Sequence, residues 1–200
     1  ERRGGHSDRA LRQLDAATQA DPDCSRIWIL RAELAREAGD TGIAITHYQR
    51  AIELDRNVVP LVLGPLLATY EEHGDMAGAA RYLQDWLTEH CDTSAVLAAA
   101  SLMRAEYGAD KARELLEQQL ARSPTVGKLR ALLDLDADIA EGLDSRRLLA
   151  IMRALNAALA DLEGGYQCRV CGLTGNTHHW QCPGCRSWSS TLPRRGALGE

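Results

Sequence analysis

The chain has 200 residues, of which 45% are apolar and 26% charged, and its formal net charge is −5. This composition is too apolar for a disordered protein, and the negative charge does not suit a chain that follows a phosphate backbone. Phenylalanine is absent and aromatic residues make up only 4%, which favours packed helices over β-sandwiches.

A repeat of about 34 residues runs through the first two thirds of the chain. Each unit has a glycine for a tight turn, a small alanine four or five residues later, and a large side chain four residues after that. The alanine lets two antiparallel helices approach, and the large side chain fills the space beside it. The glycines are Gly5, Gly39, Gly74 and Gly108, the alanines Ala10, Ala44, Ala79 and Ala112, and the large residues Leu14, Tyr48, Leu83 and Leu116.

In chain order, residues 5–22 match only the second helix of a unit, and Pro22 closes it. Residues 25–56 are the best copy, with Trp28, Ala32, Gly39, Ala44, Tyr48 and Ala51 at the expected positions. Residues 60–91 and 93–124 are weaker copies, because Trp86 and Gln119 stand where a small residue is typical; Pro124 closes the last one. The pattern resembles the tetratricopeptide repeat family, which implies an all-α fold in which helix pairs stack into a superhelix.

The incomplete first unit and the start at Glu1 rather than Met lead us to expect a piece of a longer protein. The most apolar stretch, residues 58–68, is shorter than the about 20 residues of a membrane helix and contains Pro60, Gly64 and Pro65. We therefore expect no membrane span in this chain.

Residues 126–163 depart from the repeat but still predict a helix pair that covers the last unit. An apolar stripe at helical spacing supports the second helix, and Gly164 and Gly165 end it. The stripe consists of Leu148, Ile151, Leu155, Leu159 and Leu162. The sequence thus predicts a helical domain over residues 1–163 and a second domain over residues 164–200.

The second domain is rich in Gly, Thr, Ser and Cys and is too small and polar to fold unaided. Its two C-x-x-C pairs each present two sulfurs, and the ten residues between the pairs are expected to form a short hairpin. Together the pairs form an all-sulfur tetrahedral shell that suits one structural zinc or iron ion. The predicted ligands are Cys168, Cys171, Cys182 and Cys185, whereas Cys24 and Cys91 are expected to carry no chemistry.

Other interpretations of this domain are weaker. Redox dithiols would need a surrounding α/β fold, and a catalytic zinc would keep one position open to water. We expect His178 and His179 to be exposed hairpin residues, and Trp180 and Trp188 to pack against the knuckles. Gly172 is expected to relieve the turn where backbone amides approach sulfur.

A narrower resemblance covers the whole chain. The segments are C-R-x-C-G-x-T from Cys168, W-Q-C-P-x-C from Trp180, W-S from Trp188 and P-x-R-G from Pro193. They resemble the C-terminal rubredoxin-type module of the lipopolysaccharide assembly protein B family, whose members join tetratricopeptide repeats to this module in the same order.

That resemblance implies a non-enzymatic adaptor that regulates lipopolysaccharide synthesis. It would present the lipid A deacetylase to a membrane-bound AAA+ protease for degradation, under restraint by another inner-membrane protein. It also implies an N-terminal membrane helix, absent from this chain, that holds the repeats at the cytoplasmic face of the bacterial inner membrane.

The residues themselves favour a protein-binding role, because stacked helix pairs offer a concave surface to segments of other proteins. Arg26, Glu33, Arg36 and Glu37 lie on positions of the best repeat that either face a partner or form a solvated charged surface. No paired carboxylates, nucleophile elbow or phosphate loop is present, so we expect no enzyme.

Two other function classes remain open. A zinc ribbon that binds nucleic acid would use the basic residues near the knuckles, which are Arg169, Arg186, Arg194 and Arg195, with the tryptophans for stacking. The acidic repeats argue against it, and no nucleic-acid partner is expected. A rubredoxin-like electron carrier would need a reducible iron in the four-cysteine shell.

Overall fold

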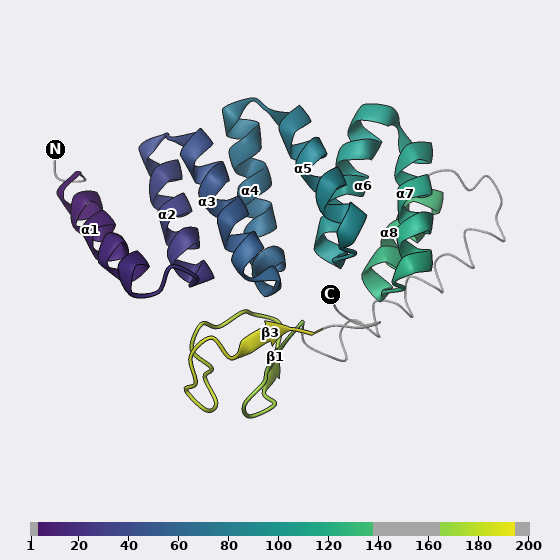
Figure 1. Cartoon of the computed structure of the whole chain (residues 1–200). Helices are drawn as coiled ribbons and strands as arrows, with labels where there is room; N and C mark the ends of the chain where they lie inside the picture. Colours follow the sequence, from purple (N-terminus) through teal and green to yellow (C-terminus); the bar gives the residue numbers. More distant parts are fainter. Residues whose placement is uncertain (1–3, 138–164, 195–200) are drawn as a thin grey trace. The chain divides into compact units, whose positions relative to one another are not determined.

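The computed structural model describes residues 4–137 and 165–194, with side chains described from Arg9 to Leu135 and throughout the second range (Figure 1). These residues form eight α-helices, a 3-10 turn and three short strands. The helices are α1 (Gly4–Ala20), α2 (Ser25–Ala38), α3 (Thr41–Leu54), α4 (Val59–His73), α5 (Met76–Glu89), α6 (Thr93–Tyr107), α7 (Ala109–Arg122) and α8 (Val126–Ala137). The 3-10 turn η1 is Arg56–Val58, and the strands are β1 (Tyr166–Cys168), β2 (Thr174–Gly175) and β3 (Thr191–Pro193). An all-α repeat array followed by a small four-cysteine module is therefore confirmed.

The chain divides into two compact units, Glu1–Arg81 and Tyr82–Glu200. In the first unit, α2 and α3 form the best repeat and pack closely on each other, and α4 packs on α3. Gly39 ends α2 in the left-handed conformation, with φ of 87°. The N–H groups of Gly39 and Asp40 donate to the carbonyls of Arg36 and Ala35, which completes the tight turn predicted from the glycine.

The predicted packing of small alanines around a large side chain is also confirmed in this unit. Ala32, Ala44 and Ala51 have no exposed surface, and Tyr48 is only 2% exposed between them. At the N-terminal end the pattern is less regular, because Gly5 lies in the first turn of α1 rather than in a turn before it. Side-chain size thus sets how closely the helices of the best repeat approach.

Two prolines lie in α4 without ending it. Pro60 occupies the first turn, where a helix needs no N–H from its residues, while Pro65 lies inside the helix. The hydroxyl of Thr69 donates to the carbonyl of Pro65 at 2.7 Å. The helix continues to His73 and ends at Gly74, which has φ of 77°.

In the second unit, α6, α7 and α8 pack on one another. Ala112 and Leu116 of α7 are buried as predicted, and α7 ends at Arg122 just before Pro124. Gln119, at a position where a small residue is typical, is 3% exposed and its Oε1 has no hydrogen-bond partner. Lys128 of α8 is fully buried and donates to the carbonyls of Cys91 and Ser123 at 2.7 and 2.9 Å.

Two sequence predictions fall on residues outside the described part of the chain. One is the second helix of the 126–163 pair, with its stripe from Leu148 to Leu162; the first helix of that pair is α8. The other is the domain boundary between residues 163 and 164, so the division into 1–163 and 164–200 stays a prediction.

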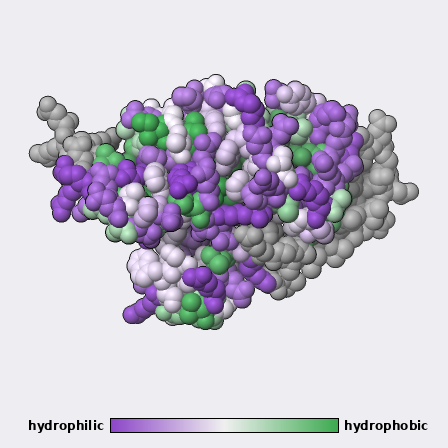
Figure 2. Space-filling model, viewed as in Figure 1, coloured by the Kyte–Doolittle hydropathy of each residue, from purple (hydrophilic) through white to green (hydrophobic). Residues whose placement is uncertain are grey.

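The surface of the described helices is mostly hydrophilic on the face shown in Figure 2, with small and separate hydrophobic patches. The large apolar side chains exposed there and elsewhere on the helices are Leu11, Leu30, Ile43, Met76 and Tyr107. Among the described residues, no helix is both long and apolar enough to cross a membrane.

Candidate metal centre

Three short strands build the framework of the metal centre. β1 is the central strand and pairs antiparallel with β2 on one side and β3 on the other. Tyr166 lies opposite Gly175 in β2 and opposite Pro193 in β3. Cys168 is the last residue of β1, and its N–H donates to the carbonyl of Leu173 at 2.8 Å. The sheet therefore fixes the start of the first C-x-x-C pair.

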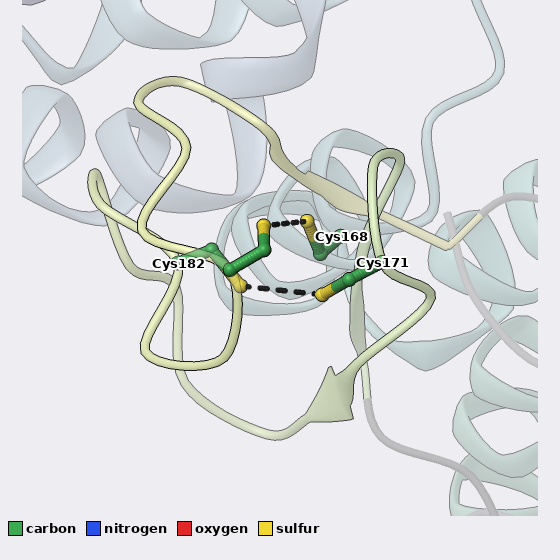
Figure 3. A group of neighbouring side chains, drawn as sticks. Cys168, Cys171 and Cys182 are labelled. Carbon is green, nitrogen blue, oxygen red and sulfur yellow. Dashed lines mark hydrogen bonds between the residues drawn. The ribbon is translucent and has the colours of Figure 1, made fainter.

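The structure brings all four predicted sulfurs together. The Sγ atoms of Cys168, Cys171, Cys182 and Cys185 all lie within 4.8 Å of one another. Figure 3 shows Cys171 and Cys182 facing each other across the two knuckles, with 3.7 Å between their sulfurs. The sulfurs of Cys168 and Cys185 are likewise 3.7 Å apart. Among the described residues, no other set of three or more His, Cys, Asp or Glu side chains gathers in this way.

These distances fit a bound ion and do not fit disulfides. A tetrahedral zinc with Zn–S bonds of about 2.3 Å separates its sulfurs by about 3.8 Å, close to the 3.7 Å found for both pairs. A disulfide would bring two sulfurs to about 2.05 Å, and all four cysteines are free thiols. The donor set is all sulfur, which suits zinc or a single iron and leaves no ligand position for water.

The two knuckles have the same backbone design. Gly172 follows the first pair and its N–H donates to the carbonyl of Cys168; Arg186 follows the second pair and its N–H donates to the carbonyl of Cys182. Both residues adopt positive φ, 77° at Gly172 and 60° at Arg186. The sequence predicted the turn at Gly172 and missed the one at Arg186, where arginine occupies a conformation that glycine adopts more easily.

Hydrogen bonds lower the charge density on the sulfur of Cys168. Cys168 is 2% exposed, and the Ser190 hydroxyl lies 3.3 Å from its Sγ. This hydroxyl, followed by the backbone N–H of Cys171, lowers the pKa of Cys168 to about 6. The backbone N–H of Val170 also donates to this sulfur at 3.4 Å, as predicted for amides near the turn.

Ser190 has one proton for two acceptors, because its Oγ also lies 3.0 Å from the carbonyl oxygen of Ser187. When Cys168 carries its proton, the thiol donates to Ser190 and Ser190 donates to Ser187. When Cys168 is a thiolate it cannot donate, so the stronger charge-assisted bond turns the Ser190 hydroxyl toward sulfur. Ser190 thus stabilises the deprotonated form that a metal needs.

The other sulfurs differ from Cys168 in their electrostatics. The hydroxyl and N–H of Ser187 lower the pKa of Cys185. The N–H of Leu173 acts in the same direction on Cys171, but desolvation and the neighbouring sulfurs outweigh it and raise the pKa of Cys171 to about 11. Four thiolates repel one another at this distance, so they can all ionise together only with a cation between them.

Some predictions about the module need correction. The ten residues between the pairs do not form a hairpin by themselves, because their strand β2 pairs with β1 across the first knuckle. His178 is half-buried between the rings of Tyr166 and Trp180, at 5.5 and 4.7 Å, whereas His179 is exposed as predicted. Trp180 is half-buried with its ring against that of His178, and its predicted packing on the knuckles stays a prediction, whereas Trp188 is 59% exposed.

The remaining predicted residues are also placed. Cys24 and Cys91 are half-buried and lie outside the four-cysteine group. Arg169 and Arg186 are exposed and Arg194 is half-buried, while Arg195 lies outside the described residues.

On the helical part, three of the four charged residues singled out on the best repeat line one pocket. Glu33, Arg36 and Glu37 of α2 surround it together with Tyr48 of α3 and Glu72 of α4; Arg26 does not line it. Their positions in the repeat singled out the α2 residues as facing either a partner or solvent. Glu72 is 36 residues from Arg36 in the chain, and only the fold brings it to the pocket. We call this site the α2–α4 pocket.

The matches to known proteins cover either the C-terminal module or nearly the whole chain. Residues 166–191 match the family model of the rubredoxin metal binding domain. The chain is 31% identical over 192 residues to lipopolysaccharide assembly protein B of Escherichia coli strain K12. The identity to the proteins of that name from E. coli O6:H1 and O157:H7 is the same. Each match covers 96% of this chain and 49% of the relative.

Proposed function

Because the chain belongs to the lipopolysaccharide assembly protein B family and spans about half the length of the curated relatives it matches, we propose that it helps regulate lipopolysaccharide assembly as a non-enzymatic adaptor. The observation that carries this proposal is the similarity over 96% of the chain, through both the helical repeats and the four-cysteine module. The relatives' name describes an assembly protein.

The finer proposal names the partners. The adaptor presents the lipid A deacetylase to a membrane-bound AAA+ protease, and another inner-membrane protein restrains that degradation. In the whole protein, an N-terminal helix outside this chain holds the repeats at the cytoplasmic face of the inner membrane. We expect no nucleic-acid partner.

The metal centre supports the role of a rigid scaffold. We propose that residues 164–200 form a domain separate from residues 1–163, with one zinc or iron held by the four clustered cysteines, Cys168, Cys171, Cys182 and Cys185. The ion, when bound, supplies positive charge that keeps four thiolates together in a closed shell. The Ser190 hydroxyl lies beside the sulfur of Cys168, where it can donate to the thiolate, and the turns at Gly172 and Arg186 direct the backbone around both pairs. Such a shell offers a fixed surface rather than a reaction site.

The test is co-purification from bacterial cells with the intact chain, a double variant Cys168→Ser/Cys171→Ser, and Cys24→Ser as a control for thiol loss. We expect the intact chain and the control to capture the protease and the deacetylase, and the double variant to lose at least one of them. The cellular half-life of the deacetylase is measured in parallel, and excess intact chain should change it by competition with the whole protein. If the intact chain captures neither protein and leaves that half-life unchanged, the adaptor proposal is wrong.

A further inference from the structure

The α2–α4 pocket has the size of a site for one side chain. Its volume is about 300 Å³, at the lower end of the range of about 300–1,000 Å³ for small-molecule sites. Three carboxylates and one guanidinium line it, which gives the lining a formal charge of −2. All the lining residues belong to the first compact unit, so one folded body builds the site.

The single cation of the pocket is already engaged. The Nε of Arg36 lies 3.0 Å from one carboxylate oxygen of Glu72, and its Nη2 lies 2.6 Å from the other. This two-point contact fixes the plane of the guanidinium. The buried Tyr48 lines the pocket together with this pair. Arg36 is therefore held toward Glu72 instead of neutralising the carboxylates of its own helix.

The other two carboxylates lack a counter-charge. Within the described part of the chain, Glu33 and Glu37 form no ion pair or side-chain hydrogen bond. They lie one turn apart on the same face of α2, a spacing at which like charges cost about 0.2–0.5 kcal/mol. Partial desolvation, and then the charge of Glu37, raise the pKa of Glu33, although both residues are exposed. A cation bound between the two carboxylates would relieve their mutual repulsion.

The geometry points to an organic cation rather than a metal ion. Among the described residues, only the four cysteines bring three or more ligand atoms close enough to share an ion. Both oxygens of Glu72 already accept hydrogen bonds from Arg36. Two carboxylates one helical turn apart suit the planar fork of a guanidinium, which has five N–H donors, better than the point charge of an ammonium group.

We propose that the α2–α4 pocket binds a basic side chain, preferentially arginine, of an extended segment of a protein partner. That the partner is a protein rests on the adaptor function proposed above, and charge complementarity selects the side chain. Glu33 and Glu37 bind the guanidinium, while the Arg36–Glu72 pair closes the opposite wall and keeps the internal arginine out of the site.

The probe is N-acetyl-arginine amide, titrated into the isotope-labelled 200-residue chain and followed by two-dimensional amide NMR. We expect saturable shifts confined to the amides of α2 and the facing turn of α4, weaker shifts with N-acetyl-lysine amide, and none with the neutral isostere N-acetyl-citrulline amide. Glu33→Gln/Glu37→Gln should raise the dissociation constant at least about tenfold, because it removes both carboxylate acceptors.

A matched control has the same charge change at the same spacing on an exposed helix face. Asp85 and Glu89 of α5 are both exposed, so Asp85→Asn/Glu89→Gln should leave the dissociation constant within about twofold. Equal weakening by the two double variants would reduce the effect to net charge and overturn the proposal. So would the absence of saturable shifts in α2, or binding of citrulline as tight as that of arginine.

A third variant tests the role of the Arg36–Glu72 pair. Glu72→Gln frees Arg36 to contact Glu33, three residues before it on α2, so binding should weaken although neither proposed ligand is changed. Adding Arg36→Met to Glu72→Gln should restore arginine binding. If binding is not restored, Arg36 does not compete with the ligand for Glu33.

Co-purification decides the adaptor function separately. If the intact chain captures the partners but does not bind arginine, the pocket proposal is wrong and the adaptor proposal is kept. If the chain binds arginine but captures neither partner, the adaptor proposal is wrong and arginine binding by the pocket is kept.

Discussion

Replacing Cys168 by serine should release the metal from the module and leave the helices folded. Cys168 is almost fully buried, ends β1, and lies 3.7 Å from the sulfur of Cys185. A serine hydroxyl is a weak zinc ligand that stays protonated near neutral pH, so the shell falls from four thiolates to three.

The expected loss of metal affinity is obtained by dividing the free energy of metal binding equally among the four ligands. Structural zinc sites bind with about 10–16 kcal/mol, so one of four equivalent thiolates accounts for about 3 kcal/mol, or roughly a hundredfold in affinity. The module has little to replace it, because its buried residues in the described range are Cys168, Cys182, Ser190, Thr191 and Pro193. None of these is a large aliphatic side chain.

The assay is competition for the metal with a chelator of known affinity, read by elemental analysis, together with far-UV circular dichroism and amide NMR. We expect Cys168→Ser to lose metal and the amide dispersion of residues 165–194, while helical ellipticity stays, since the described module contributes strands only. Cys24→Ser, which changes a cysteine outside the cluster, should behave as the unchanged chain. Unchanged metal affinity in Cys168→Ser, or equal loss in Cys24→Ser, would refute the four-sulfur site.

Four substitutions test the supporting contacts. Ser190→Ala should lower metal affinity by about 10–100-fold in the same competition assay while the sheet persists at excess metal, since only the hydroxyl beside the sulfur is lost. Arg186→Gly should raise the free energy of unfolding of the module and Gly172→Ala lower it, each by about 1–2 kcal/mol, because both positions have positive φ and no atom lies within 4 Å of an added Cβ at Gly172. The thermal midpoints should shift in opposite directions, and shifts of the same sign would contradict this account. Glu33→Gln should raise the urea midpoint at neutral pH. A carboxyl with a raised pKa penalises the folded state while charged, so the difference should shrink as the pH falls through the folded pKa and vanish below the lower pKa of the unfolded chain; a constant difference down to about pH 3 would contradict this.

The sequence predicted features that depend on one residue type at one place. Gly39 and Gly74 must turn the chain with positive φ, and Ala44 must leave room for a second helix, so their spacing alone revealed the repeat. The metal ligands are equally local, because each C-x-x-C pair forms one turn and thiolate chemistry admits few alternatives. Such features need no knowledge of distant contacts.

Features built from distant residues were not predictable. Glu72 meets Arg36 only after α4 packs beside the best repeat, and His178 is covered only after the strand with Tyr166 is in place. The prediction of a hairpin between the two C-x-x-C pairs was wrong for the same reason. The strand β2 pairs with β1, which precedes the first knuckle in the chain. One missed feature did leave a signal: Arg186 follows its C-x-x-C pair as Gly172 follows the other, so equivalence of the two knuckles implied a second left-handed turn.

The closed sulfur shell limits what the module can do for the protein. With four thiolates as ligands, no position remains for a substrate or a water molecule at the ion, so binding must use the outer surface of the knuckles. That surface includes Val170, which directly precedes Cys171, and Leu173, two residues after it; they are 61% and 45% exposed. Leu173 also lies against Gly184 of the second knuckle, with 3.3 Å between its Cδ2 and a Cβ placed there. Loss of the ion would release the two knuckles from each other and change this surface at once. Metal content and partner capture should therefore fall together in the cysteine variants, whereas an electron carrier would need the ion itself to change oxidation state.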